Sequence, residues 1–295
     1  MLSNTFYQSV TNKVIAALEA GSPPWVKPWD GTPMLPCNAI TGRPYSGINT
    51  LILWMSAQQG AYPSQGWLTF KQAKEIGATV RKGEKGTPIS FVKRVERQEG
   101  DERTTPVLRT FWVFNTAQVE NLPAAYVSQP PEARGEETFD AALQFTRDCG
   151  IAISYGADQA CYYPRRDEIH MPAYGRFHDD QAFFGTLFHE LVHATGHKNR
   201  LDRDCGRRFG DAKYAFEELV AELGSAFLCA RYGYPAEHRS ASYVDAWLKG
   251  LKQDKRAIFY AAAYASKGAD YLVQTAERAV SEQATETGRK LETAE

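Results

Sequence analysis

Residues 186–203 read TLFHELVHATGHKNRLDR, and this stretch contains the pattern HELVH from His189 to His193. The surrounding apolar residues recur at helical spacing, so we predict a helix here. Residues four positions apart share one face of a helix, which lets His189 and His193 bind the same metal ion. Glu190 lies beside them, where it can act as a general base, as in the helix of zinc hydrolases. The stretch therefore predicts a metal site in the second half of the chain.

The third metal ligand has to come from another part of the chain, because a catalytic zinc ion usually has three protein ligands and one open position. The metzincin pattern does not supply it, since the position for its third histidine holds Asn199 and His197 comes too early. His197 lies two turns from His189 on the same helical face. As a fourth ligand it would close the site.

A second predicted helix, residues 214–232, offers carboxylates for the remaining position, and its apolar face can pack against the first helix. Glu222 is the expected ligand, because it lies near the middle of this helix and the small residues at 224–225 would permit a close approach. Glu218 lies one turn earlier on the same face and is the alternative, either as ligand or as a group that orients a histidine. Glu217 lies nearer the N-terminus of the helix.

Around these two helices, the second half of the chain predicts a small sheet followed by helices. A helix is expected at 138–148, and the chain should be helical from residue 180 onward. The short β-branched and aromatic runs between them predict strands at 151–155, 160–164 and 168–171.

The first half predicts an α+β domain. Apolar residues at helical spacing indicate helices at 6–21, 48–57 and 69–76, the last one capped by a threonine and closed by a glycine. Two β-branched and aromatic runs, 87–96 and 107–115, predict a hairpin.

A proline-rich stretch between the halves has no apolar period and predicts a linker. The expected domains are residues 1–124 and 138–295, joined by a linker at 125–137. The fold class expected for the whole chain is therefore α+β, in two domains.

The composition of the 295 residues, with 43% hydrophobic and 23% charged residues, is that of a folded protein. No stretch reaches the roughly 20 apolar residues of a membrane span, and the N-terminus lacks a signal-peptide pattern, so we expect a cytoplasmic protein with no membrane partner. The five cysteines are scattered and never form CxxC, which predicts reduced, packing thiols.

Positive charge is concentrated in one segment, although the formal net charge of the chain is only -1. Residues 67–97 hold eight basic and three acidic residues. Such a local excess indicates a polyanionic partner.

Longer motifs in both halves resemble known proteins. PCNAITGRPYSGIN (36–49), WLTFKQAKEIGATVRKGEKGTPISFVKR (67–94) and FWVFNTAQVENL (111–122) resemble the N-terminal domain of the ArdC antirestriction family and of TraC-type plasmid primases. DEIHMP (167–172), the stretch 186–203 and YAFEELVAELGSAFL (214–228) resemble the zincin-type metallopeptidase-like domain joined to it in the ArdC family.

The resemblance implies a plasmid-borne, conjugation-related protein that binds single-stranded DNA through its N-terminal domain and protects incoming DNA from host restriction enzymes. The residues of this half agree, because single strands are held by basic grooves and aromatic faces. The candidate contacts are Arg43, Tyr45, Trp67, Lys71, Lys74, Arg81, Lys82, Lys85, Lys93 and Arg94, with Phe70 as a further face. Most other large aromatics are expected in the core, namely Trp25, Trp29, Trp54 and Trp112.

Two other functions compete with single-strand binding. The alternative is a zinc-dependent endopeptidase whose basic N-terminal domain targets a protein substrate. A primase activity is disfavoured, because the first half has no cluster of metal-binding carboxylates and no phosphate-binding glycine-rich loop. In either remaining case the expected cofactor is one divalent ion, zinc or alternatively manganese, with host restriction machinery as a further partner of an antirestriction protein.

Overall fold

The computed structural model describes residues 2–26, 34–96, 104–127, 136–204, 212–236 and 241–292. The chain forms two compact units, each with its own network of contacts. The first contains Met1–Ala17 and Met34–Pro131, and the second contains Leu18–Pro33 and Glu132–Glu295. The expected α+β class with two kinds of domain is confirmed, while the exact domain bounds expected from the sequence stay a prediction.

The first unit is built on a four-stranded sheet in the order β1-β2-β5-β4. Its strands are β1 (Cys37–Asn38), β2 (Gly66–Thr69), β4 (Thr87–Glu96) and β5 (Thr104–Asn115). β4 and β5 form the expected hairpin, with Thr87 opposite Val113 and Glu96 opposite Thr104. β2 runs antiparallel to β5 and parallel to β1.

Helix α2 (Ile48–Gln59) packs against β4 and closes the core of this unit. The core contains Leu53 and Ala57 from the helix, together with side chains from the strands. α1 (Leu2–Glu19) precedes it in the chain. The short α3 (Phe70–Glu75) begins after Thr69, the cap that the sequence predicted, and Thr69 also forms a capping box with Gln72. Further along, β3 (Thr79–Val80) pairs with β6 (Val119–Glu120).

The second unit begins with α4 (Glu136–Asp148), followed by a three-stranded sheet in the order β7-β9-β8. Its strands are β7 (Ala152–Tyr155), β8 (Cys161–Tyr163) and β9 (Glu168–Met171). β9 runs parallel to β7 and antiparallel to β8, so β8 is an edge strand. The α-helices that follow in the described residues are α5 (Asp180–Thr195), α6 (Ala212–Arg231), α7 (Val244–Gln253) and α8 (Ala257–Glu292).

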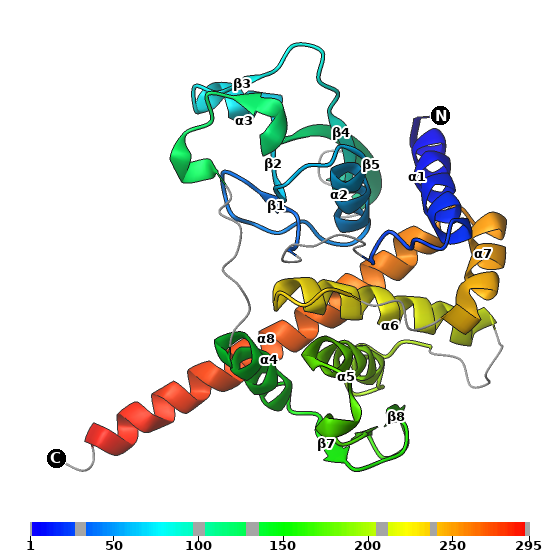
Figure 1. The fold of residues 1–295 in the computed structure, drawn as a ribbon, viewed down its shortest axis with the longest axis vertical. Helices are drawn as coiled ribbons and strands as arrows, with labels where there is room; N and C mark the ends of the chain where they lie inside the picture. Colours follow the sequence, from blue (N-terminus) through cyan, green and yellow to red (C-terminus); the bar gives the residue numbers. More distant parts are fainter. Residues whose placement is uncertain are drawn as a thin grey trace. The chain divides into compact units, whose positions relative to one another are not determined.

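Helices α5 and α6 approach each other closely, and α8 contacts both (Figure 1). A Cβ atom on Gly224 of α6 would lie 2.8 Å from Cγ1 of Val192 on α5, so only glycine fits at this crossing. The next residue, Ser225, donates a hydrogen bond of 2.8 Å to the carbonyl of Gly185. Side chains on the facing surfaces of α5 and α6 are thereby brought within reach of one shared ion.

No helix in the described part of the chain is both long and apolar enough to cross a membrane. Within that part, Cys37, Cys149, Cys161 and Cys229 are free thiols. Burial raises the pKa of the Cys37, Cys149 and Cys161 thiols, so they stay protonated at neutral pH, as expected for packing residues. Cys205 lies outside the described residues.

Candidate metal centre and nucleic-acid interface

Three side chains of α5 and α6 converge on one point. The Nε2 atoms of His189 and His193 are 3.0 Å apart. The two carboxylate oxygens of Glu218 each lie 3.5 Å from one of these nitrogens. Ligands of a tetrahedral zinc ion, at bonds of about 2.0 Å, lie roughly 3.3 Å from one another, so this spacing fits a bound divalent ion. His189, His193 and Glu218 therefore form a candidate metal centre.

Glu222, the ligand favoured by the sequence, lies on the other side of a histidine ring. Its Oε2 atom is 3.9 Å from Nδ1 of His189, and its Oε1 accepts a hydrogen bond of 3.4 Å from Nε1 of Trp25. The geometry thus favours Glu218 as ligand and Glu222 as the group that faces the back of the His189 ring. The two carboxylates are one helical turn apart, so a rotation of α6 decides between them.

Glu217 lies beside Nδ1 of His193, on the side of the ring away from the candidate metal position. Its Oε1 atom lies 3.5 Å from Nδ1 of His193, and it also accepts hydrogen bonds of 2.7 and 3.1 Å from Arg203. Burial raises the pKa of Glu217, but the hydrogen bonds from His193 and Arg203 outweigh it, and the net pKa is lowered. Glu217 is therefore a carboxylate at neutral pH. It can fix the orientation and tautomer of His193.

Glu190 is oriented by the sheet. Its Oε2 atom accepts a hydrogen bond of 2.7 Å from the backbone N–H of Tyr162, which lies on the edge strand β8. The carboxylate borders a cavity of about 1660 Å³ that also contains His189 and His193. The structure therefore places the Glu190 carboxylate beside the candidate metal centre, within a space large enough for another molecule.

Two tyrosines, Tyr214 and Tyr243, also line this cavity and were not singled out in the sequence. Burial raises the pKa of Tyr214, and the Glu218 carboxylate raises it further, so its hydroxyl keeps its proton. Tyr214 lies four residues before Glu218 on α6, and this helical spacing is the only signal that could have identified it.

His197, considered as a fourth ligand, lies near a different acidic group. Its Nδ1 atom is 3.7 Å from Oδ2 of Asp167. The same aspartate binds Arg200 and accepts a hydrogen bond of 2.7 Å from the hydroxyl of Tyr162. Among the described residues, His197 is not part of the group that converges with His189.

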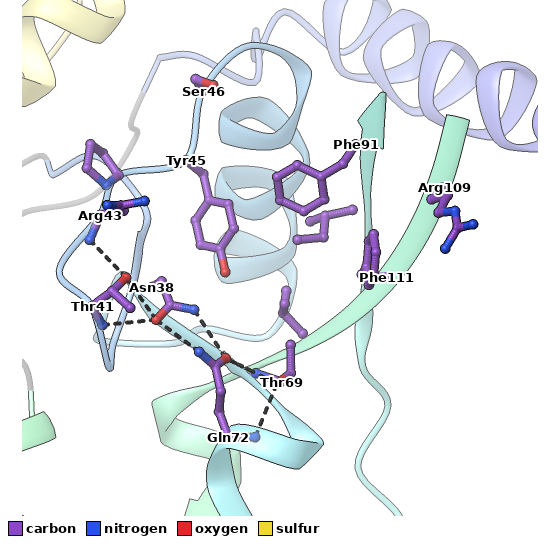
Figure 2. A pocket seen from close by; sticks show the side chains of 13 residues that line it. Asn38, Thr41, Arg43, Tyr45, Ser46, Thr69, Gln72, Phe91, Arg109 and Phe111 are labelled. Carbon is purple, nitrogen blue, oxygen red and sulfur yellow. Dashed lines mark hydrogen bonds between the residues drawn. The ribbon is translucent and has the colours of Figure 1, made fainter. Parts of the chain in front are cut away.

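A separate pocket of about 740 Å³ lies in the first unit (Figure 2). We call it the sheet pocket. Two of the predicted DNA contacts, Arg43 and Tyr45, line it. The described residues that line it are Asn38, Thr41, Arg43, Pro44, Tyr45, Ser46, Thr69, Gln72, Ile89, Phe91, Arg109, Phe111 and Val113. Among these described residues there are two arginines and no carboxylate.

Trp67 does not provide an accessible face. Its side chain is 0% exposed and packs edge-to-face against Tyr62 in the core of the first unit. β2 lies between β1 and β5, so a side chain on its covered face is buried. Trp112, expected in the core, is instead 59% exposed. Trp25 is buried as expected, while Trp29 lies outside the described residues.

The predicted basic contacts are exposed but differ in their partners. Lys74, Lys82 and Lys85 are exposed, and so is Lys71, whose Nζ atom lies 3.6 Å from Glu75. Arg81 forms two hydrogen bonds to Glu84, at 2.7 and 3.1 Å. The side chains of Lys93 and Arg94 lie outside the described part of the chain.

Two exposed aromatic side chains of the hairpin, Phe91 and Phe111, were missed by the sequence reasoning. Their side chains are 47% and 44% exposed. Phe70, which the sequence had already named, is 59% exposed. Phe91 and Phe111 lie on adjacent strands with ring centroids 5.6 Å apart. They lie two residues from Ile89 and Val113, and this alternation along a strand was the available signal.

Comparisons with known proteins agree with the families that the two halves of the sequence resemble. Residues 4–114 match the family described as the N-terminal domain of anti-restriction factor ArdC, and residues 140–264 match a zincin-like metallopeptidase family. An uncharacterized protein, y4eC, of Sinorhizobium fredii is 40% identical over 90% of this chain and 91% of its own length. A DNA primase TraC of Escherichia coli is 40% identical over 95% of this chain, but the match covers only 28% of the primase.

Two solved structures of the antirestriction protein ArdC from plasmid R388 are similar over nearly the whole chain. The metal-free structure has 43% identity and a TM-score of 0.78, covering 92% of this chain and 98% of the other. The Mn(II)-bound structure has 42% identity and a TM-score of 0.77, covering 92% and 97%.

Proposed function

This chain belongs to the ArdC family of antirestriction proteins, and from that premise we propose that it protects incoming plasmid DNA from restriction by binding its single strands. The sheet pocket is the observation that carries this proposal. It combines apolar and aromatic side chains with Arg43 and Arg109, and none of the described residues that line it is a carboxylate. Binding of single strands requires this combination of aromatic faces and positive charge.

Exposed lysines extend the positive charge beyond the pocket. Lys71 and Lys74 lie on α3, which begins directly after Thr69 of the pocket lining. Cations placed along a groove attract the phosphates of a strand without reading its sequence. We therefore expect binding with little sequence preference and weaker binding of duplex, whose paired bases cannot stack on protein rings.

For the second unit we propose a zinc centre held by His189, His193 and Glu218, with manganese as the alternative ion. The spacing of the three ligand atoms and the mixed nitrogen and oxygen donors suit either ion. Bound there, the ion would supply a Lewis acid beside Glu190. We propose that its contribution to protection is to stabilise the fold of the second unit, because occupation of DNA by protein requires no bond cleavage.

The second candidate function is a zinc-dependent endopeptidase with the first unit as its targeting module. One specific observation favours it: Glu190 is oriented by the N–H of Tyr162 and borders a cavity of about 1660 Å³. A coordination site with no other purpose would not need such a base.

A titration separates the two functions. The full-length protein is added to a fluorescent single-stranded oligonucleotide at several salt concentrations, with duplex of the same sequence as control. The antirestriction proposal expects binding whose affinity falls steeply with salt and is weaker for duplex. Absence of binding to the single strand even at low salt would leave the endopeptidase as the better explanation.

A further inference from the structure

The sheet pocket contains a set of groups that suits one planar, partly polar ring with negative charge on either side. We propose that this pocket holds a single unstacked nucleobase of the bound strand, with the neighbouring phosphates near Arg43 and Arg109. The inference rests on the proposed single-strand binding and adds to it the place where a base is held.

The apolar part of the pocket is formed by residues of the β4–β5 hairpin. Ile89 and Val113 are each 1% exposed and form its floor. Phe91 and Phe111 lie beside them on the same strands, and their side chains are 47% and 44% exposed. Large apolar side chains are normally covered, so two half-exposed phenyl rings beside an apolar floor indicate a surface that a ligand covers. A nucleobase provides a flat face for such rings.

The polar part of the pocket lies opposite, on residues whose positions are fixed by hydrogen bonds (Figure 2). Asn38 Nδ2 donates to Gln72 Oε1 at 3.2 Å, and Gln72 Nε2 donates to Asn38 Oδ1 at 3.3 Å. Gln72 is further held by the backbone N–H of Thr69 at 2.9 Å. A carboxamide has two N–H donors, so Gln72 keeps a second donor after its bond to Asn38. Such fixed amides suit the polar edge of a base.

The charge of the pocket suits a ligand that carries phosphates. Arg43 and Arg109 are exposed and lie on opposite sides of the pocket in Figure 2, one before α2 and the other on β5. Their guanidinium groups can bind phosphate oxygens through two hydrogen bonds each. Because the arginines flank the aromatic rings, a strand that contacts both would place the intervening base over Phe91 and Phe111.

The volume of the sheet pocket agrees with a nucleobase as ligand. At about 740 Å³ the pocket lies within the range of roughly 300–1,000 Å³ that is usual for small-molecule sites. A base inside a duplex cannot enter, because it is stacked and paired. A free mononucleotide has the same chemistry as a nucleotide within a strand, so the experiment must separate the two.

The test uses the full-length protein and a matched pair of substitutions on one strand. Phe111→Ala removes a ring of the pocket, and Trp112→Ala removes a more exposed aromatic ring, 59% against 44%, that projects from the other face of β5. A stacked base contributes about 1–3 kcal/mol, so Phe111→Ala should weaken single-strand affinity about 5- to 150-fold. Trp112→Ala should leave it nearly unchanged. Phe111→Tyr keeps the ring and should restore binding, which separates ring loss from misfolding.

A crosslinking measurement locates the base directly. An oligonucleotide that contains 5-iodouracil is irradiated with the wild-type protein, and the adduct is mapped by mass spectrometry. We expect the adduct on Tyr45, Phe91 or Phe111, and an adduct on Phe70 or Trp112 instead would overturn the proposal.

The remaining outcomes distinguish loss of the base pocket from loss of single-strand binding as a whole. Normal binding by Phe111→Ala overturns the base pocket but leaves single-strand binding intact. Absence of binding by the wild-type protein overturns both. The last experiment is a competition with thymidine monophosphate. If the free nucleotide displaces the strand at an equal concentration of nucleotide, the pocket is a site for free nucleotides and the proposal fails.

Discussion

The Oε1 atom of Glu217 lies 3.5 Å from Nδ1 of His193, on the side of the imidazole ring away from Glu218. The adjacent Glu218 faces Nε2 of the same ring. Helix α6 therefore contacts both nitrogens of His193 with neighbouring residues, one carboxylate at the candidate metal position and one behind the ring. This arrangement gives three acidic residues of one helix different expected roles.

Glu218→Gln should abolish tight metal binding, whereas Glu222→Gln should weaken it only about 10- to 100-fold, because it acts on the orientation of His189 rather than on the ion. Metal affinity measured by chelator competition checks this ranking. Both variants change one buried carboxylate of α6 to an amide, so each is the control for the other. The reverse order would restore Glu222 as the ligand.

Glu217→Gln should destabilise the metal-free protein by about 3–5 kcal/mol, because Arg203 would be left buried without its charged partner. The side chains of both residues are only 5% exposed. The control is Glu277→Gln, which breaks the exposed pair with Arg231 and should cost at most about 1 kcal/mol. Urea unfolding measures both, and equal effects would show that the buried pair has no special role.

Metal binding should strengthen as the pH rises. Burial lowers the pKa of His193, but hydrogen bonds to Glu217 and Glu218 raise it to about 10 in the metal-free protein. The protonated imidazole stabilises the metal-free fold fully below about pH 6.5, its unfolded value, and this stabilisation is lost as the pH rises toward 10. An ion needs the neutral ring, so binding must release a proton. Calorimetry in buffers of different ionisation enthalpy counts the proton, and a pH-independent affinity would contradict the prediction.

Glu190→Gln should leave protection against restriction intact, because it removes the base but keeps the shape of the site. Transfer of unmodified plasmid DNA into restricting cells, at matched expression of wild type and variant, measures protection. Metal content and single-strand binding are checked in parallel. Loss of protection by a folded, metal-loaded variant would show that hydrolysis is required and would support the endopeptidase.

Lys82→Glu combined with Lys85→Glu should weaken single-strand binding and flatten its salt dependence, because fewer phosphate contacts release fewer counterions. Both lysines are exposed in the first unit. The control introduces the same charge change at Lys249 and Arg278 of the second unit. An unchanged slope in the first variant would place the strand on another surface.

The sequence by itself determined the elements that carry the metal centre. The periodicity around His189 and His193 predicted α5, and the spacing of four residues placed both rings on one face, because these properties depend only on the geometry of a single helix. The capped α3 and the hairpin of β4 and β5 were predicted for the same reason, since their signals are local.

Only the tertiary structure decided between side chains that local rules treat alike. Glu218 and Glu222 share a face of α6, and the rotation of α6 against α5 brings Glu218 to Nε2 of both histidines and Glu222 behind one of them. The sequence predicted Trp67 as an accessible DNA contact and Trp112 as a core residue, and both predictions were wrong. The pairing of strands buries the first and exposes the second, because burial depends on neighbours that are distant in the chain.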